Sequence, residues 1–508
     1  MRNAAIASLL MSACALAAPA NRCEDLATAS FGADVKIESA KLVVAAANLP
    51  EHCDVRGVIW PEAKFAVKLP TNWNNRFEMV GGGGFAGVIS LAAMDSAVRA
   101  DYATTSTDTG HDAKKEPGAS FAYPGPNNPH AARKVIDHGY LAVHETALLA
   151  KKMIRAYYGS DPRYSYWAGC STGGRQGLME AQRYPEDFDG YVVGAPVLYL
   201  TGLQMKGVWN HLAVATGPGQ IKVEKLPALA KAVYEKCDAI DGLKDGLIEN
   251  PLKCGFDPAK DLERCAGHTD GPNCFTGAQI EGLKKVYDGP RDSKGRQLFP
   301  GEPPGAEAFA PGAQGGEAHS GWEATVTDSV PRFADSFMKF MAFDPPAGPN
   351  WDYHTFNFDT DVQRMSAVAL RIDATITDLS AVKARGGKIV HYHGWADPGV
   401  PAKMSVNYYE DSMRAMGEKE TQDFYRFFPV PGMFHCGGGP GCSSVNWLAA
   451  VVDWVEKGIA PAMLAGAHVE ASKTTRTRPI CAYPNVAQYK GSGSIDAAEN
   501  FTCVAAGP

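Results

Sequence analysis

The stretch that decides the fold of this chain is Tyr164-Ser165-Tyr166-Trp167-Ala168-Gly169-Cys170-Ser171-Thr172-Gly173-Gly174. The run of Tyr and Trp that ends at Gly169 is typical of a β-strand. A Gly-x-Ser-x-Gly sequence follows, with Ser171 at its centre, and residues 174–184 have a helical pattern. A serine on a strand–turn–helix of this kind has its hydroxyl exposed at the carboxyl end of a sheet. Ser171 is therefore the candidate nucleophile.

Upstream of this turn, the sequence alternates between strand and helix patterns. Strands are expected over residues 55–70, 76–80 and 102–107, and a helix over residues 130–158. The strand over 76–80 runs directly into a glycine run, Gly81 to Gly84. Glycines in this place let backbone N–H groups face a reacting oxygen, so Gly83 and Gly84 are candidate oxyanion-hole residues together with Thr172. A plain tight turn would use the same glycines.

Alternating strands and helices favour a mostly parallel sheet covered on both faces. The alternation fades after about residue 200 and returns with strands over 388–393 and 423–430 and a helix over 445–457. We therefore expect an α/β-hydrolase fold with a large inserted lid domain. The expected division is 1–20 as a signal peptide, 21–200 and 376–508 as two parts of the catalytic domain, and 201–375 as the lid.

The composition excludes some classes of protein. The 508 residues are 45% hydrophobic and 21% charged, as in a globular domain, and the formal net charge is −7. A negative chain is not expected to bind nucleic acid or an anionic membrane. No stretch beyond the amino terminus is long and apolar enough to span a membrane, and nothing in the sequence indicates the oligomeric state.

The amino terminus has the pattern of a secretory signal. Arg2 precedes an apolar stretch over residues 4–18, and small residues up to Ala20 form a cleavage site, with Ala17 as the alternative. The mature protein is therefore expected outside the cytoplasm, either secreted or periplasmic. Cys14 leaves a lipoprotein signal as a minor alternative.

Twelve cysteines are present, and removal of the signal leaves eleven. In an exported protein most of these are expected in disulfides. Proximity in the sequence suggests four local pairs: Cys23 with Cys53, Cys237 with Cys254, Cys265 with Cys274, and Cys481 with Cys503. Cys170, Cys436 and Cys442 remain, and the sequence alone does not determine the connectivity.

A serine nucleophile needs a base and an orienting carboxylate, which in α/β-hydrolases follow the serine in the order acid, then histidine. Asp397 lies just past the strand over 388–393, and His435 lies in a glycine-rich loop past the next strand. These two are the candidate acid and base. His393 is the rival base, but its place four residues before Asp397 suits a supporting role better.

Cys170 is the neighbour of Ser171, and Cys436 is the neighbour of His435. If Ser171 and His435 lie within hydrogen-bond reach, these two cysteines lie close enough to form a disulfide. Pairing with Cys442 and a buried free thiol at Cys170 are the alternatives.

A loop over residues 237–248 interleaves aspartates with glycines. The side chains of Asp238, Asp241 and Asp245 and the carbonyls of Leu243 and Leu247 could bind Ca²⁺, although the spacing is not that of an EF-hand. The alternative is a turn-rich loop in which aspartates bond to nearby backbone N–H groups.

With the motifs Gly169-Cys170-Ser171-Thr172-Gly173-Gly174-Arg175-Gln176-Gly177, Arg183-Tyr184-Pro185-Glu186-Asp187-Phe188-Asp189-Gly190 and Gly194-Ala195-Pro196, the chain resembles the tannase and feruloyl esterase family. That family also includes mono(hydroxyethyl) terephthalate hydrolase. The resemblance implies a Ser171–Asp397–His435 triad, a Cys170–Cys436 disulfide, and a structural Ca²⁺ held by the aspartate loop of the lid.

The expected function is therefore a secreted serine carboxylic ester hydrolase. It would cleave feruloyl, galloyl or terephthaloyl esters, which are small aromatic substrates, through an acyl-enzyme. Lid aromatics that could stack on such an acyl group are Trp209, Trp322, Phe340 and Trp351, unless they form the lid core. The alternative is a catalytically inactive, calcium-dependent carbohydrate-binding protein on a hydrolase scaffold.

Overall fold

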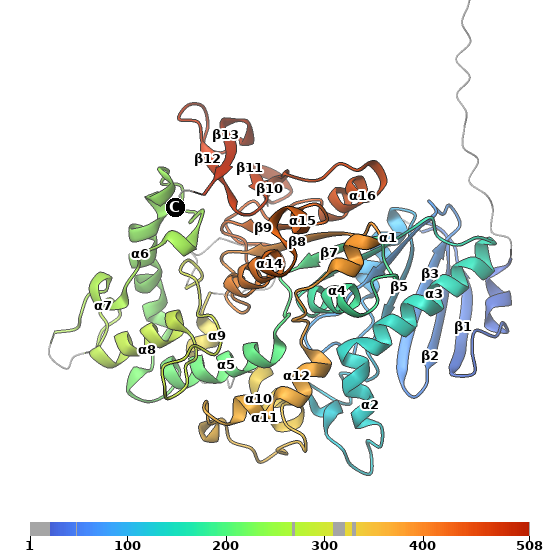
Figure 1. Ribbon diagram of the computed structural model, residues 1–508, viewed down its shortest axis with the longest axis horizontal. Helices are drawn as coiled ribbons and strands as arrows, with labels where there is room; N and C mark the ends of the chain where they lie inside the picture. The colour runs from blue at the N-terminus through green and yellow to red at the C-terminus, as the bar shows by residue number, and fades with distance from the viewer. Residues whose placement is uncertain (1–20, 47, 267–269, 308–320, 328–331, 507–508) are drawn as a thin grey trace, which may run out of the picture.

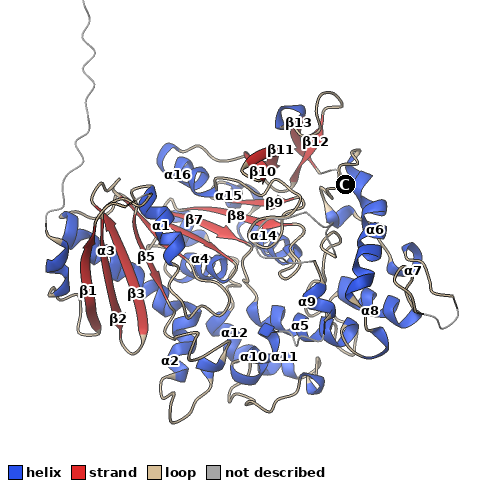
Figure 2. Cartoon of the chain, turned by 180° about the vertical axis from the view of Figure 1, so that it is seen from behind, coloured by secondary structure: helices blue, strands red, loops and turns tan. Residues whose placement is uncertain are grey.

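A nine-stranded sheet forms the centre of the molecule in the computed structural model (Figures 1 and 2). The structure describes residues 21–506 except 47, 267–269, 308–320 and 328–331. The strands lie side by side in the order β1 (Val35–Val43), β2 (His52–Ile59), β3 (Ala63–Pro70), β5 (Ala103–Thr107), β4 (Arg76–Val80), β6 (Tyr164–Cys170), β7 (Gly190–Gly194), β8 (Lys388–Gly394) and β9 (Tyr425–Val430).

The sheet is antiparallel at its first edge and parallel in its centre. Strands β1, β2, β3 and β5 pair antiparallel, and every pair from β5 through β4 to β9 is parallel. Because the carboxyl ends of parallel strands meet at one edge, the loops after β4, β6, β8 and β9 open on the same side of the sheet. The α/β-hydrolase fold expected from the sequence is confirmed.

Successive side chains of the central strands point to opposite faces of the sheet and pack in two separate hydrophobic cores. Trp167 and Val193 pack in the core that contains α3 (Ala142–Tyr158) and α4 (Thr172–Arg183). Their neighbours Tyr166 and Val192 pack on the other face, in the core that contains α1 (Leu91–Arg99) and α16 (Trp447–Lys457). Burial on both faces explains why all five residues of β7 are buried.

Strands β7 and β8 are neighbours in the sheet, although the helices α5 to α13 lie between them in the sequence. These helices are α5 (Leu200–Val214), α6 (Leu226–Cys237), α7 (Pro258–Asp261), α8 (Gly277–Asp288), α9 (Glu323–Val326), α10 (Arg332–Phe340), α11 (Asp361–Arg364), α12 (Ser366–Ile372) and α13 (Ser380–Ala384). Helices α5 to α9 gather at one end of the molecule, opposite β1 to β3 (Figure 1). Val214, Leu229 and Trp322 belong to a separate apolar core in this region. The exact domain boundaries, at residues 200 and 375, remain a prediction.

Beyond β8 the chain adds α14 (Ala402–Met416), α15 (Glu418–Gln422) and two antiparallel hairpins. The hairpins are formed by β10 (Met463–Glu470) with β11 (Lys473–Cys481), and by β12 (Asn485–Tyr489) with β13 (Phe501–Ala505). These hairpins and β1 have no counterpart among the expected elements.

Two expected elements are divided in the structure. Residues 55–70 form β2 and β3, separated by a turn. The helix expected over 130–158 consists of α2 (Ala131–Ile136), a π-helical turn (Asp137–Leu141) and α3. In this turn the carbonyls of His138 and Gly139 accept hydrogen bonds from the buried Arg175 guanidinium, which takes them out of the regular helical pattern.

Among the described residues, five disulfides are present: Cys23–Cys53, Cys170–Cys436, Cys237–Cys254, Cys265–Cys274 and Cys481–Cys503. They are the five pairs expected above, and Cys442 is a buried free thiol. In the described part of the chain, no helix is long and apolar enough to cross a membrane. The proposed signal peptide, with Ala17, Ala20 and Cys14, lies outside the described residues.

Candidate active site

Ser171 occupies the sharp turn between β6 and α4. Its φ of 62° and ψ of −122° lie outside the favoured regions for a residue with a side chain, so the backbone is strained there. The turn is held from both sides: the Ser171 N–H donates to the Gly194 carbonyl at 2.9 Å, and the Ser171 carbonyl accepts from the Val197 N–H at 3.2 Å. The neighbouring strand β7 therefore keeps the serine in this conformation.

The glycines around Ser171 are required by close backbone contacts. A Cβ atom added at Gly169 would lie 2.6 Å from the Gly173 backbone, and one added at Gly173 would lie 3.0 Å from the Gly82 carbonyl oxygen. The buried Trp167 indole donates to the Gly173 carbonyl at 3.0 Å and holds the start of α4 in place. The backbones therefore lie too close together at these glycines for side chains to fit between strand β6, helix α4 and the glycine loop after β4.

Asp397 and His435 form a hydrogen-bonded pair beside this turn. His435 Nδ1 lies 2.6 Å from Asp397 Oδ2, and Asp397 Oδ1 accepts from the N–H groups of Gly399 at 3.0 Å and Val400 at 2.9 Å. Burial by itself would raise the pKa of Asp397, but the attraction of His435 and the hydrogen bonds it receives hold that pKa well below its usual range. Burial likewise disfavours the charged imidazole, but the Asp397 charge and hydrogen bond outweigh it and raise the pKa of His435 above 6.5.

The Cys170–Cys436 disulfide joins the residues that adjoin Ser171 and His435. The two Cα atoms lie 5.8 Å apart, although the cysteines are 266 residues apart in the sequence. The structure therefore brings together all three candidate triad residues, each from the loop that follows a different parallel strand.

His393, the rival base, lies behind Asp397. Its ring is fully buried, with Nε2 3.2 Å from Asp397 Oδ2 and 2.9 Å from the Val400 carbonyl, and with Nδ1 2.7 Å from Ser405 Oγ. His393 therefore supports the acid and its loop. The contribution of Ser405, on α14, had no signal in the sequence, because nothing local marks this serine as a partner of His393.

The candidate oxyanion residues lie on both sides of the Ser171 turn. Thr172 is the first residue of α4, where an N–H has no acceptor inside the helix, and its hydroxyl donates to the Gly84 carbonyl. In the same loop the Gly82 N–H donates to Gln176 Oε1 at 3.0 Å. Among the described residues, no acceptor is bonded to the N–H of Gly83 or Gly84. These groups remain available to a ligand.

Phe333, on α10, is the lid aromatic that approaches this loop. Its side chain is 51% exposed, its ring centre lies 5.7 Å from that of Phe85, and a Cβ atom added at Gly84 would meet it at 3.5 Å. Among the lid aromatics suggested by the sequence, Trp322 is fully buried in the lid core, and the Trp209 indole donates to the Lys285 carbonyl. No signal in the sequence distinguishes Phe333 from the other aromatics, because only the packing of α10 on the glycine loop sets it apart.

The aspartate loop of residues 237–248 uses its carboxylates for local hydrogen bonds. Asp238 accepts from the N–H groups of Asp245 and Gly246, Asp241 accepts from the Leu243 N–H at 3.0 Å, and Asp245 accepts from the Leu247 N–H at 3.2 Å. Burial and the neighbouring carboxylates raise the pKa values of Asp238 and Asp241.

All of these donors are oxygens, which suits Ca²⁺, and each carboxylate has further lone pairs. In the described residues, however, the three carboxylates do not all converge within 4.8 Å, and Asp245 also pairs with Arg478. An ion bound in this loop would therefore have to take part of its ligands from main-chain carbonyls, and those of Leu243 and Leu247 are the candidates.

Comparison with known proteins identifies the relatives of this chain. Residues 47–504 match the family model described as tannase and feruloyl esterase. The chain therefore belongs to the tannase and feruloyl esterase family. An uncharacterized esterase of Xanthomonas campestris pv. campestris is 36% identical, with 99% of this chain and 93% of that protein covered.

The mono(2-hydroxyethyl) terephthalate hydrolase of Piscinibacter sakaiensis is 32% identical, with 92% of this chain and 87% of that protein covered. The crystal structure of feruloyl esterase B from Aspergillus oryzae superposes with a TM-score of 0.85 at 27% identity, over 95% of this chain and 99% of that one. The tannase-family resemblance is thus confirmed, and the protein is a carboxylic ester hydrolase. None of these relatives supports the alternative of an inactive carbohydrate-binding protein.

Proposed function

We propose that this family member hydrolyses esters of aromatic carboxylic acids through an acyl-enzyme formed on Ser171. The observation that carries the proposal is the 2.6 Å His435–Asp397 pair, tied by the Cys170–Cys436 disulfide to the strained turn of Ser171. This arrangement suits nucleophilic attack on an acyl carbon rather than binding alone.

In the proposed reaction, neutral His435 takes the Ser171 hydroxyl proton through Nε2 as the serine oxygen attacks the ester carbonyl. The N–H groups of Thr172 and of Gly83 or Gly84 stabilise the oxyanion that forms. Protonated His435 then donates its proton to the leaving alcohol, and the acyl group remains on Ser171. Water, activated by His435, releases the acid and regenerates the serine.

The aromatic acyl group is inferred from Phe333 and from the relatives. An exposed aromatic ring beside the oxyanion loop can stack on a planar acid, a geometry that favours aromatic over aliphatic acyl groups. Feruloyl and terephthaloyl groups, named in the descriptions of two relatives, are both aromatic acids.

The test is a rate panel over methyl ferulate, methyl gallate, a terephthalate half-ester and vinyl acetate. Wild type is expected to prefer at least one aromatic acyl ester, and Ser171→Ala is expected to lose activity on the order of a million-fold in kcat. Ser96→Ala, at an exposed position of α1, is the matched control and should keep full activity. If Ser171→Ala keeps more than a few per cent of activity, the assignment of the nucleophile is wrong.

The proposal also covers the location of the enzyme and a bound metal ion.

We infer export from the cytoplasm, either to the periplasm or to the medium, because the signal-like residues 1–20 precede a chain whose described residues form five disulfides. We also propose a structural Ca²⁺ held by Asp238, Asp241, Asp245 and the carbonyls of Leu243 and Leu247, supported by the all-oxygen donor set of that loop.

A further inference from the structure

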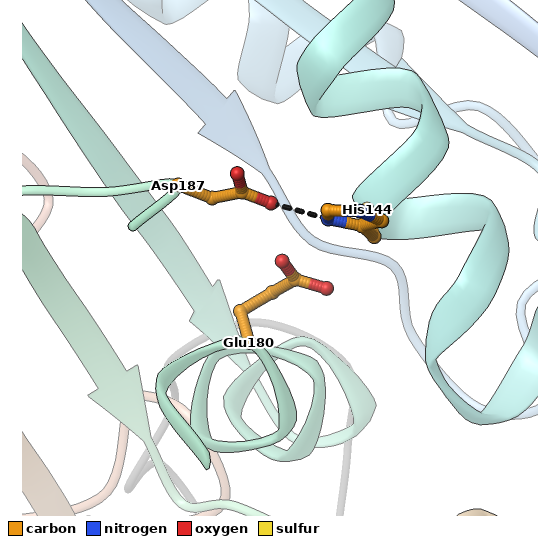
Figure 3. Close-up of side chains that lie close together, drawn as sticks. All are labelled: His144, Glu180 and Asp187. Carbon is orange, nitrogen blue, oxygen red and sulfur yellow. Dashed lines mark hydrogen bonds and ion pairs between the residues drawn. The ribbon is translucent and has the colours of Figure 1, made fainter. Parts of the chain in front are cut away.

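His144, Glu180 and Asp187 form a cluster away from the triad. They come from α3, from α4 and from the loop between α4 and β7, and Figure 3 shows the three side chains pointing toward one another. One ligand atom from each residue lies within 4.8 Å of the other two, and His144 Nδ1 lies 2.6 Å from Asp187 Oδ2. Glu180 is nine residues beyond Ser171, about 13 Å along the helix axis. The cluster is therefore separate from the reacting atoms.

Glu180 has no hydrogen-bond donor to satisfy its charge. The residue is fully buried, and within the described residues neither carboxylate oxygen has a hydrogen-bond partner. Its carboxylate points into the gap between His144 and Asp187 (Figure 3). A buried carboxylate beside a second one calls for a positive charge in that gap, either a proton or a metal ion.

Among the described residues, no side-chain donor bonds to Glu180, although a cation lies nearby. Lys151, a nearby cation, donates its hydrogen bond to the main-chain carbonyl of Asp187. The Tyr184 ring stacks on the His144 imidazole with the ring centres 3.6 Å apart, which fixes the direction of Nδ1. The His144 side chain is 17% exposed, whereas that of Asp187 is 1% exposed, so the imidazole forms the solvent-facing side of the cluster.

We propose that His144 Nδ1 and the carboxylates of Glu180 and Asp187 bind one divalent transition-metal ion, of which Zn²⁺ is the model. One imidazole nitrogen with two carboxylate oxygens suits Zn²⁺, whereas Ca²⁺ takes oxygen ligands alone. On binding, the proton between Nδ1 and Asp187 is released to solvent together with any proton on the Glu180 carboxyl, and water fills the fourth position. The ion ties α3 to α4, the helix that begins at the nucleophile.

The test is Zn²⁺ binding to the full chain after chelation and dialysis, measured by calorimetry and by metal analysis of the dialysed protein. Wild type is expected to bind one Zn²⁺ per chain and to show a higher melting temperature with Zn²⁺ present. Glu180→Gln keeps the shape of the side chain and removes its charge. It should weaken binding by more than the ~100-fold that loss of an outer-shell partner can cost.

Two further variants make the result decisive. His144→Gln, at a partly exposed position, should also lose Zn²⁺ binding, and it provides the test if Glu180→Gln does not fold. Asp411→Asn, on the surface of α14 and outside both proposed metal sites, should bind Zn²⁺ like wild type. The proposal is overturned if His144→Gln and folded Glu180→Gln retain wild-type Zn²⁺ binding. It is also overturned if wild type binds none, which would leave Glu180 as a neutral acid bonded to Asp187.

Discussion

At the scale of single residues, the proposed ester hydrolysis depends on the hydrogen bonds that the Asp397 carboxylate accepts. Its two oxygens receive the Gly399 and Val400 N–H groups and the His435 ring, and His393 lies 3.2 Å behind it. A carboxylate with this many donors stays ionised, and its charge is aimed at one nitrogen of His435. His435 is thus oriented with Nδ1 toward the acid, which leaves Nε2 for the serine.

The pH dependence of the reaction should report the raised pKa of His435. Since His435 accepts a proton only when it is neutral, activity falls as the pH drops through its pKa. The acid limb of kcat/KM is therefore expected above pH 6.5. Asp397→Asn removes the charge that raises this pKa. The limb should move to lower pH, while kcat falls on the order of 10⁴-fold. Asp411→Asn, on the surface of α14, is the control and should leave the limb in place. An unmoved limb in Asp397→Asn would exclude His435 as the titrating base.

At the scale of elements, the site consists of loop segments at the carboxyl ends of β4, β6, β8 and β9. The sheet sets their spacing, and the Cys170–Cys436 bond joins the β6 turn to the loop after β9. The Ser171 turn and the His435 loop are thus joined by a covalent bond between neighbouring residues as well as placed by the strand order.

Loss of this disulfide should reduce kcat beyond its effect on stability. We expect Cys170→Ala with Cys436→Ala to lower kcat by up to about 10²-fold, because small misplacement of reacting groups has effects of that size. The rates are compared at a temperature where both proteins are fully folded. Cys265→Ala with Cys274→Ala, which opens a small lid loop, should change the melting temperature alone. An unchanged kcat in the first variant would show that the bond only stabilises the fold.

Phe333 of α10 is the lid side chain beside the glycine loop. Removal of this side chain should lower kcat/KM selectively for aromatic esters. Burying an aromatic ring against a ligand is worth about 1.5–3 kcal/mol, so Phe333→Ala should lower kcat/KM for methyl ferulate roughly 10- to 100-fold. Hydrolysis of vinyl acetate should change little. Ile376→Ala removes a similarly exposed apolar side chain and serves as the control. Equal losses on both esters would mean that Phe333 does not contact the acyl group.

At the scale of the whole molecule, the aspartate loop lies where distant parts of the chain meet. Arg478 of β11 donates to the Asp245 carboxylate, and Glu249 accepts from the Ala487 N–H of β12. The loop after α6 and the carboxyl-terminal hairpins are therefore packed together. An ion in this loop would stabilise that contact rather than take part in the reaction.

Calcium removal should therefore lower the melting temperature more than it affects kcat. An ion that binds only the folded protein stabilises it by about 2.7 kcal/mol at a hundred times its Kd. The melting temperature should fall with EGTA and return when Ca²⁺ is added back. In Asp241→Asn the response to Ca²⁺ should be lost, while Glu180→Gln should retain it. A melting temperature that is independent of Ca²⁺ in wild type would contradict the site.

The strands of the carboxyl-terminal hairpins could not be predicted from the sequence. Strand β10 has one fully buried position among its eight residues, so it lacks the alternation that predicts a strand. Its pairing with β11 and the bridge from Ser444 to Ala467 depend on contacts with other segments. Propensity alone does not predict such strands, because their neighbours stabilise them.

The sequence by itself determined the features that are local: the strand, turn and helix around Ser171, the glycine loop before it, and the order of Ser171, Asp397 and His435. The turn and the glycine loop are each encoded within a few residues, where backbone geometry limits the possible residues, and the order of the three candidate triad residues is read directly along the chain. The tertiary structure alone decided that His393 lies behind Asp397, that Phe333 reaches the glycine loop, and that His144, Glu180 and Asp187 converge. Those contacts join side chains from separate elements, and their directions are set by how the helices pack on the sheet.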